Sequence, residues 1–133
     1  MTNLRLKASL DEANPEGALG EGSVLEDNSY FKSIPHFADC HLAIRVSGHS
    51  MYPKYCNGDI VVCKRIFNHL YVPYGEPHLV VMEDCYLLKF IHPHPTDKTM
   101  YLLCSVNEKF DPMEVKRTDV LEIYLVRGRF ELT

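Results

Sequence analysis

The sequence contains no run of about 18 apolar residues and no apolar core of signal-peptide length near its start. These absences predict a protein that neither spans a membrane nor is secreted. The five cysteines include no C-x-x-C pair, the spacing typical of zinc sites and redox motifs. His92 and His94 lie close together but supply only two ligands, so we expect loop residues rather than a metal site. We therefore expect reduced thiols in a cytoplasmic protein without metal or other cofactor.

Positive charge is missing from residues 8–31, which contain no lysine or arginine. Glycine, proline and acidic residues dominate this stretch, so it cannot bury enough apolar surface to fold alone. We expect a flexible acidic arm or linker over residues 1–30 and one domain over residues 31–133. The formal net charge of −4 gives no indication that this chain itself binds nucleic acid.

From about residue 30 onward the sequence changes to short runs typical of β-strands. Glu83 and Asp84 are typical of a hairpin turn, and the run His92-Pro-His-Pro95 predicts that a strand breaks there. The predicted strands span residues 41–46, 60–66, 79–82, 86–91, 100–106 and 120–126. Six or more strands in one domain predict a mostly-β fold.

The segment SMYPKYC, which begins at Ser50, does not fit the strand pattern. Pro53 is tolerated in the first turn of a helix, and Asn57 with Gly58 can end one. We therefore expect one short helix here, with Ser50 at its N-terminus. The chain contains no helix-turn-helix pattern, so DNA binding is expected only through a separate domain outside this chain.

Ser50 and Lys89 are the candidate catalytic residues. A serine hydroxyl needs a base beside it and hydrogen-bond donors where an oxyanion forms. The backbone N–H groups of Ser50 and Met51 at the expected helix N-terminus supply such donors. Lys89 shares a strand face with Leu87 and Ile91, and burial of that face favours the neutral amine, which is a usable base. Before any family resemblance is considered, the pattern alone favours a helix-capping serine and a strand-edge lysine.

Three stretches in the expected order resemble the LexA, phage-repressor and UmuD self-cleaving proteins. VSGHSMYPKYCNGDIVVCKRI (residues 46–66) resembles the V-x-G-x-S-M-x-P…G-D signature, most closely that of bacterial phage-type repressor C-terminal domains. CYLLKFI (residues 85–91) is similar to the strand with the family's lysine, and SVNEKFDP (residues 105–112) resembles a downstream stretch. The resemblance implies the bent β-sheet fold shared with signal peptidases, with a short helix after the nucleophile. It also implies a Ser-Lys dyad of Ser50 and Lys89, with Met51 as an oxyanion donor.

The family usually cuts its own linker at Ala-Gly or Cys-Gly, and this sequence contains neither pair. The nearest sequence is the run Gly17, Ala18, Leu19 and Gly20. We expect any cut in this region, with Leu19 as the obstacle to speed. His49 stands where the family usually has Asp or Glu, and its side chain is expected to point away from Ser50.

The resemblance implies a self-cleaving transcriptional regulator of SOS-response or phage genes. Cleavage would be stimulated by a RecA-type filament, and the apolar run over residues 120–132 predicts a homodimer. Two alternatives stay open. One is a catalytically silent dimerisation and sensing module of a repressor; the other is a UmuD-like translesion-polymerase accessory, which fits if Met1 is the native start. A membrane signal peptidase fits least, because the sequence has no transmembrane anchor.

Overall fold

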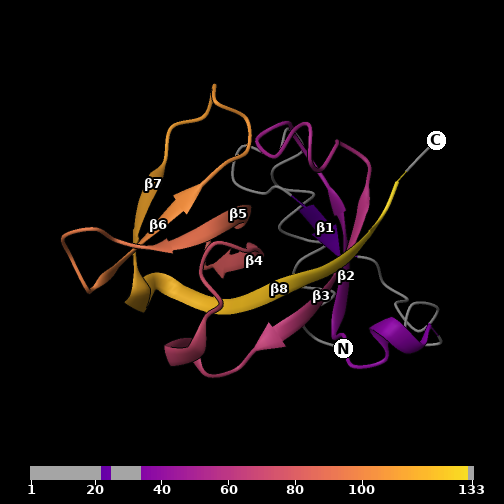
Figure 1. Cartoon of the computed structure of the whole chain (residues 1–133), viewed down its shortest axis with the longest axis horizontal. Coiled ribbons are helices and arrows are strands. Elements are labelled where there is room, and N and C mark those ends of the chain that lie inside the picture. The colour runs from indigo at the N-terminus through magenta and orange to yellow at the C-terminus, as the bar shows by residue number, and fades with distance from the viewer. Residues whose placement is uncertain (1–21, 25–33, 132–133) are drawn as a thin grey trace.

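The computed structural model describes residues 22–24 and 34–131, and the fold of this part is mostly β (Figure 1). Its strands form one antiparallel sheet in the order β1-β2-β3-β8-β4-β5-β6-β7. The strands are β1 (Gly22–Val24), β2 (Leu42–Val46), β3 (Ile60–Ile66), β4 (Pro77–Met82), β5 (Tyr86–Pro93), β6 (Met100–Cys104), β7 (Met113–Lys116) and β8 (Val120–Phe130). Three single 3-10 turns join them, η1 (Pro35–Phe37), η2 (His69–Tyr71) and η3 (Arg117–Asp119). The described residues contain no α-helix, and none of their helical turns has the length or hydropathy to cross a membrane.

Strand β8 runs across the whole molecule, with β5 to β7 gathered near one end and β1 and β2 near the other (Figure 1). Ile123, Tyr124 and Leu125 pair with β3 on one side and with β4 on the other. The strand therefore joins the two halves of the sheet. Because both of its edges are occupied over this stretch, β8 is an interior strand rather than a sheet edge.

The core of the described residues contains three apolar clusters, and the two larger ones lie on opposite faces of β4 and β5. On β4 and β5, Leu79 and Leu88 belong to the first cluster, and Val80 and Leu87 belong to the second. Neighbouring residues of a strand point to opposite faces, so both faces of these two strands are buried. This explains why β4 and β5 read as continuous apolar runs instead of an alternating pattern.

Most predicted strands are confirmed, and the turn and strand break expected from the sequence are present. The turn at residues 83–84 is a hairpin, closed by a 2.9 Å hydrogen bond from Met82 N to Cys85 O. The predicted break in the run His92-Pro-His-Pro95 is confirmed, because β5 ends inside it, although His92 and Pro93 still pair with β6. Proline is tolerated at a strand end, where its missing N–H is not required by a neighbouring strand. Strand β7 was not predicted; it is short, and only Val115 in it is buried.

The expected short helix after Ser50 is absent. Tyr52 N donates to His49 O at 3.1 Å and Tyr55 N donates to Met51 O at 2.8 Å, so the segment is a series of turns. Only the second bond has helical spacing. Pro53 lacks an N–H, and the chain reverses at Gly58, so too few residues remain to offset the cost of nucleating a helix. The oxyanion donors must therefore be identified individually rather than assigned to a helix dipole.

Three residues of the expected arm form strand β1. Gly22 lies opposite Val46 and Val24 lies opposite Ile44, in antiparallel pairing with β2. Strand β1 also approaches β5, which contains Lys89. The rest of residues 1–30, including the expected cleavage region at residues 17–20, lies outside the described residues. The chain thus enters the sheet at the end of β2 that leads directly to Ser50.

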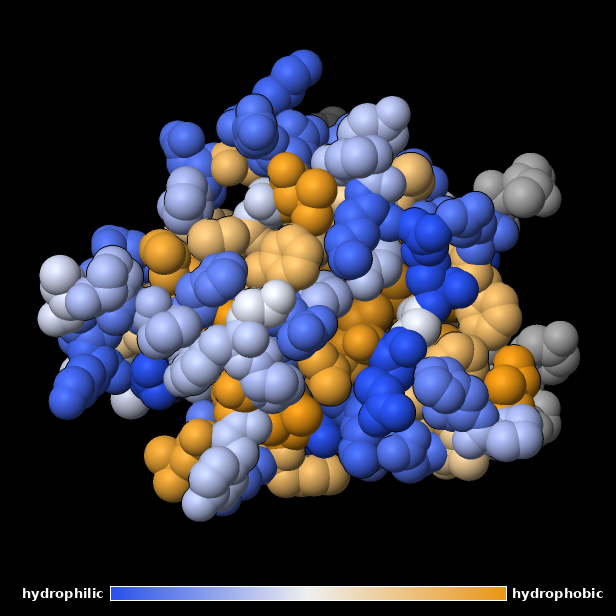
Figure 2. Space-filling view, in the orientation of Figure 1, coloured by the Kyte–Doolittle hydropathy of each residue, from blue (hydrophilic) through white to orange (hydrophobic). Residues whose placement is uncertain are grey.

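Apolar side chains reach the surface over the connection between β3 and β4 (Figure 2). Phe67, Leu70 and Tyr71 in this connection are 69%, 80% and 76% exposed. The Arg65 guanidinium stacks over the Phe67 ring at 4.8 Å from its centroid and covers part of it. Phe67 and Tyr71 are the two most exposed aromatic side chains in the described part of the chain, and both lie outside residues 120–132, where a dimer contact is expected.

Candidate active site

Ser50 lies in the loop of residues 47–59 that joins β2 to β3, here called the Ser50 loop. Gly58 N donates to Val46 O at 2.8 Å and Val46 N donates to Asp59 O at 2.7 Å, which closes the base of the loop. Gly48 N donates to the Asn57 side chain at 3.0 Å. Gly48 and Gly58 have φ angles of 88° and 95°, which only glycine adopts readily. Gly58 and Asp59 therefore have a structural role in the turn that leads into β3.

The buried side chain of Met51 anchors the backbone next to Ser50 in the core. Met51 is 2% exposed and belongs to the first core cluster, as does Tyr55. Ser50 itself is only 3% exposed, whereas His49 and Tyr52 on either side of this pair are exposed. Among the residues described, the Met51 N–H has no hydrogen-bond acceptor. A buried serine beside an uncommitted backbone donor is chemically suited to nucleophilic attack with oxyanion binding.

Lys89 lies in β5 and is 3% exposed. Its Nζ donates to Ser105 Oγ at 2.9 Å and lies 5.6 Å from the centroid of the Phe110 ring. A buried amine requires such partners, because desolvation without hydrogen bonds is costly. A serine hydroxyl can accept from an ammonium or donate to a neutral amine, so it serves Lys89 in either protonation state.

One short stretch of chain holds both candidate catalytic residues. Residues 105–110, here called the bridging segment, follow β6 and contain the Ser105 partner of Lys89. Two residues later, Asn107 N donates to Ser50 O at 2.9 Å, and Asn107 Nδ2 donates to His49 O at 3.0 Å. The segment therefore fixes the backbone at Ser50 and the amine of Lys89 relative to each other.

The sequence pattern does not identify the roles of Ser105 and Asn107, although the stretch that contains them resembles one in the self-cleaving proteins. A signal for Ser105 was available in the strand register. Phe90 pairs with Cys104 across β5 and β6, so the next position along places Ser105 opposite Lys89. Nothing comparable identifies Asn107, because its partners lie in a loop more than 50 residues earlier.

A fully buried histidine lies beside the lysine. His78 in β4 is directly opposite Lys89 in β5 and is 0% exposed. Its Nδ1 lies 2.7 Å from Glu76 O; a carbonyl can only accept, so Nδ1 carries the proton. Burial lowers the pKa of His78 to about 4. The ring is therefore neutral at physiological pH, and its buried Nε2 has no partner in the described part of the chain.

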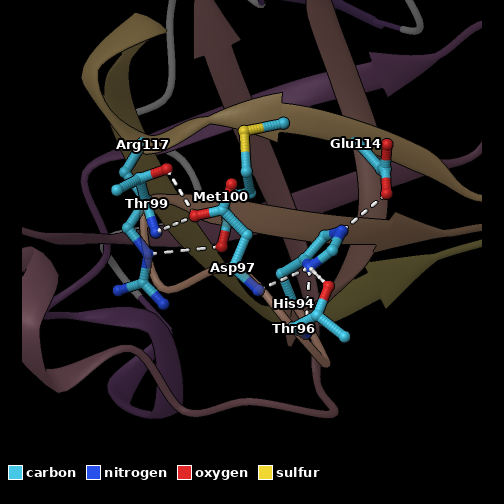
Figure 3. Close-up of polar contacts among 7 residues, drawn as sticks. All are labelled: His94, Thr96, Asp97, Thr99, Met100, Glu114 and Arg117. Carbon is cyan, nitrogen blue, oxygen red and sulfur yellow. Dashed lines mark hydrogen bonds and ion pairs between the residues drawn. The ribbon is translucent and has the colours of Figure 1, made fainter.

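The second histidine of the H-P-H-P run has a structural role (Figure 3). His94 Nδ1 accepts from the backbone N–H groups of Thr96 at 3.2 Å and Asp97 at 3.0 Å, and Nε2 contacts Glu114 Oε1 at 2.5 Å. These contacts tie the β5–β6 connection to β7. Within residues 22–24 and 34–131, no group of three or more His, Cys, Asp or Glu side chains is arranged to hold a metal.

Comparison with known proteins assigns the family. The sequence matches the family model described as Peptidase S24-like over residues 15–127, which include Ser50, Lys89 and the bridging segment. No curated protein matches the sequence. The match covers far more than half of the chain, and the curled antiparallel sheet is consistent with it. The chain therefore belongs to the Peptidase S24-like family, which is the family of LexA, UmuD and phage repressors.

Proposed function

We propose that this serine peptidase-like domain cleaves its own chain as part of a LexA or phage-repressor-like transcriptional regulator, with Ser50 as nucleophile and Lys89 as general base. The observation that carries the proposal is the shared attachment of both residues to residues 105–107. Both side chains are 3% exposed. A buried serine and a buried lysine held by one short segment fit proton transfer between them, which requires a fixed geometry.

In the proposed reaction, neutral Lys89 accepts the hydroxyl proton of Ser50 while Ser50 Oγ attacks a peptide carbonyl. The N–H groups of Ser50 and Met51 stabilise the oxyanion. Collapse of this intermediate breaks the C–N bond, and Lys89 returns the proton to the leaving amine. Water then hydrolyses the ester at Ser50, with Lys89 as the base again. Ser105 keeps the amine in place at each stage by exchanging its roles as acceptor and donor.

The pairing of β1 with β2 supports an intramolecular substrate. Gly22 lies opposite Val46, four residues before Ser50. A chain extends at most about 3.6 Å per residue, so residue 18 is at most about 14 Å from Gly22. The four residues from Gly22 back to residue 18 therefore equal in number the four from Val46 to Ser50, which fits a cut in the small residues at 17–20. We propose that the cut falls between Gly17 and Glu21.

The partners of the domain follow from the same proposal. We propose a homodimer, stimulation of cleavage by a RecA-type filament, and DNA binding through a separate domain. Because both edges of β8 are occupied at residues 123–125, a dimer contact through that stretch must use side chains on the faces of the sheet rather than strand pairing. Light scattering at high micromolar concentration tests the dimer, and a monomer would contradict it.

The alternative function is a catalytically silent dimerisation and sensing module, or a UmuD-like polymerase accessory. It is favoured by Leu19, which interrupts the Ala-Gly junction preferred for cleavage. A fluorophosphonate probe separates a working nucleophile from a silent one. We expect mass-spectrometric peptide mapping to find the label on Ser50 in the wild type, and a greatly reduced label in Lys89→Ala. An unlabelled but folded wild type would favour the silent module.

A further inference from the structure

We propose that Asn107 is a positioning residue that orients two successive peptide groups so that the N–H groups of Ser50 and Met51 point toward the reacting carbonyl oxygen. The inference rests on the proposed function of Ser50 and assigns a role to a residue outside the Ser-Lys dyad. It is drawn from two hydrogen bonds made by the same residue to adjacent carbonyls.

The geometry of the peptide group carries the first step. A trans peptide is planar, and its N–H points away from its C=O. The Ser50 carbonyl and the Met51 N–H belong to one peptide group, and the His49 carbonyl and the Ser50 N–H belong to the preceding one. Asn107 N holds the Ser50 carbonyl at 2.9 Å, and Asn107 Nδ2, at 3.0 Å, shares the His49 carbonyl with Tyr52 N, at 3.1 Å. Fixing these two oxygens fixes the direction of both N–H groups.

The second step is that Asn107 is itself held. Its Oδ1 accepts from Lys109 N at 3.0 Å, and its backbone carbonyl accepts from Phe110 N at 3.1 Å. The side-chain amide therefore uses its acceptor within the bridging segment and directs its donor to the Ser50 loop. Aspartate would keep the acceptor but lose the donor, and alanine would lose both.

The third step concerns the Met51 N–H, the donor that is oriented by the contact from Asn107 N to the Ser50 carbonyl. The Met51 N–H makes no hydrogen bond within the described residues, although Met51 is 2% exposed. A buried N–H without an acceptor is uncommon and costs stability, so its presence beside the nucleophile fits a donor kept available for an oxyanion. The carbonyl of the same peptide group, in contrast, is fully engaged by Asn107.

The maximal rate and the pH midpoint of cleavage distinguish a role of Asn107 in orienting the oxyanion donors from a merely structural role. Asn107 acts on the oxyanion donors, whereas Lys89 is held by Ser105. Loss of the Asn107 side chain removes the bond from Nδ2 to the His49 carbonyl and leaves the backbone bond to the Ser50 carbonyl in place, so it acts on the Ser50 N–H. It should therefore lower the maximal cleavage rate without moving the pH midpoint of the rate. Removing one preorganised oxyanion donor typically lowers rates about 100- to 1000-fold, so misorienting a donor should cost about 10- to 100-fold.

The experiment compares full-length wild type with Asn107→Ala, Asn107→Asp and the matched control Lys109→Ala, which leaves the Lys109 backbone N–H in place. Self-cleavage is followed from neutral to alkaline pH by intact mass, and a boronic acid, which forms a tetrahedral adduct at serine, is titrated as a mimic of the oxyanion. Thermal unfolding of each variant verifies folding. We expect Asn107→Ala to lose about 10- to 100-fold in both maximal rate and boronate affinity, with an unchanged pH midpoint.

A folded Asn107→Ala protein with the wild-type rate and boronate affinity would overturn the inference while leaving the proposed function intact. An equal loss of maximal rate and boronate affinity in Lys109→Ala would also overturn the inference, because any change in the bridging segment would then have the same effect. Wild type that neither cleaves nor binds the boronic acid would instead overturn the proposed function, and with it the inference. Asn107→Asp keeps the bond to Lys109 N, so a loss in this variant as well would assign the effect to the Nδ2 donor.

Discussion

Acidification should destabilise the domain through His78. The folded protein keeps this ring neutral, because burial lowers its pKa from 6.5 to about 4. The unfolded chain therefore binds more protons than the folded one between about pH 6.5 and pH 4, and the free energy of unfolding falls as the pH falls through this window. Each pKa unit is worth about 1.4 kcal/mol, so the full loss is on the order of 3 kcal/mol. That is a large share of a typical domain stability of about 5–15 kcal/mol.

Urea unfolding of the wild type and of His78→Leu at several pH values above 4 measures this loss. The variant should be less stable near pH 7, because it loses the hydrogen bond to Glu76 O, but its free energy of unfolding should depend much less on pH. His69, whose pKa is also lowered by burial, is present in both proteins and cancels in the difference. Asp39 and Asp97, whose pKa values are lowered, titrate below the window. Equal pH dependence in both proteins would refute the reasoning.

Three further predictions concern the site, the sheet and the substrate. Ser105→Ala removes the hydroxyl that accepts from Lys89 Nζ, so the maximal cleavage rate should fall about tenfold or more, with Ser105→Thr restoring it; an unchanged rate in a folded Ser105→Ala protein would contradict this. Gly128→Ala places a Cβ 2.4 Å from the Phe37 ring, so it should lower the free energy of unfolding, measured with urea, by about 1–3 kcal/mol. Adding Phe37→Ala to this variant should relieve part of the loss, and additive losses would exclude the clash. Leu19→Gly creates an Ala-Gly junction and should accelerate alkaline self-cleavage measured by intact mass; a folded, fluorophosphonate-reactive variant that stays uncut would indicate a retired peptidase.

The strands could be predicted because local sequence largely determines them. Runs such as residues 60–66 match β3 from end to end, and the acidic turn between β4 and β5 marks a hairpin. The helix after Ser50 could not be predicted correctly, since proline and glycine signals fit a helix start and stop as well as a series of turns. Five or six residues are too few for periodicity to decide between the two.

The candidate dyad could be proposed from sequence, whereas the contacts that support it could not. Ser50 and Lys89 belong to recognisable stretches, and the burial of Lys89 follows from its apolar neighbours on β5. The clamp made by Asn107 depends on a loop-to-loop contact, which has no strand register or helical period to reveal it. The neutral state of His78 depends on complete burial, and a histidine in an apolar run can equally be exposed at a sheet edge.

The most direct test of the central claim is self-cleavage of the purified protein at alkaline pH, followed by intact mass. A lysine base must be neutral, and free lysine loses its proton near pH ~10.4, so cleavage should accelerate as pH rises. The account predicts two complementary fragments with a junction between Gly17 and Glu21, and no fragments from Ser50→Ala or Lys89→Ala proteins that remain folded. Cleavage that persists at the same junction in either variant would contradict the account.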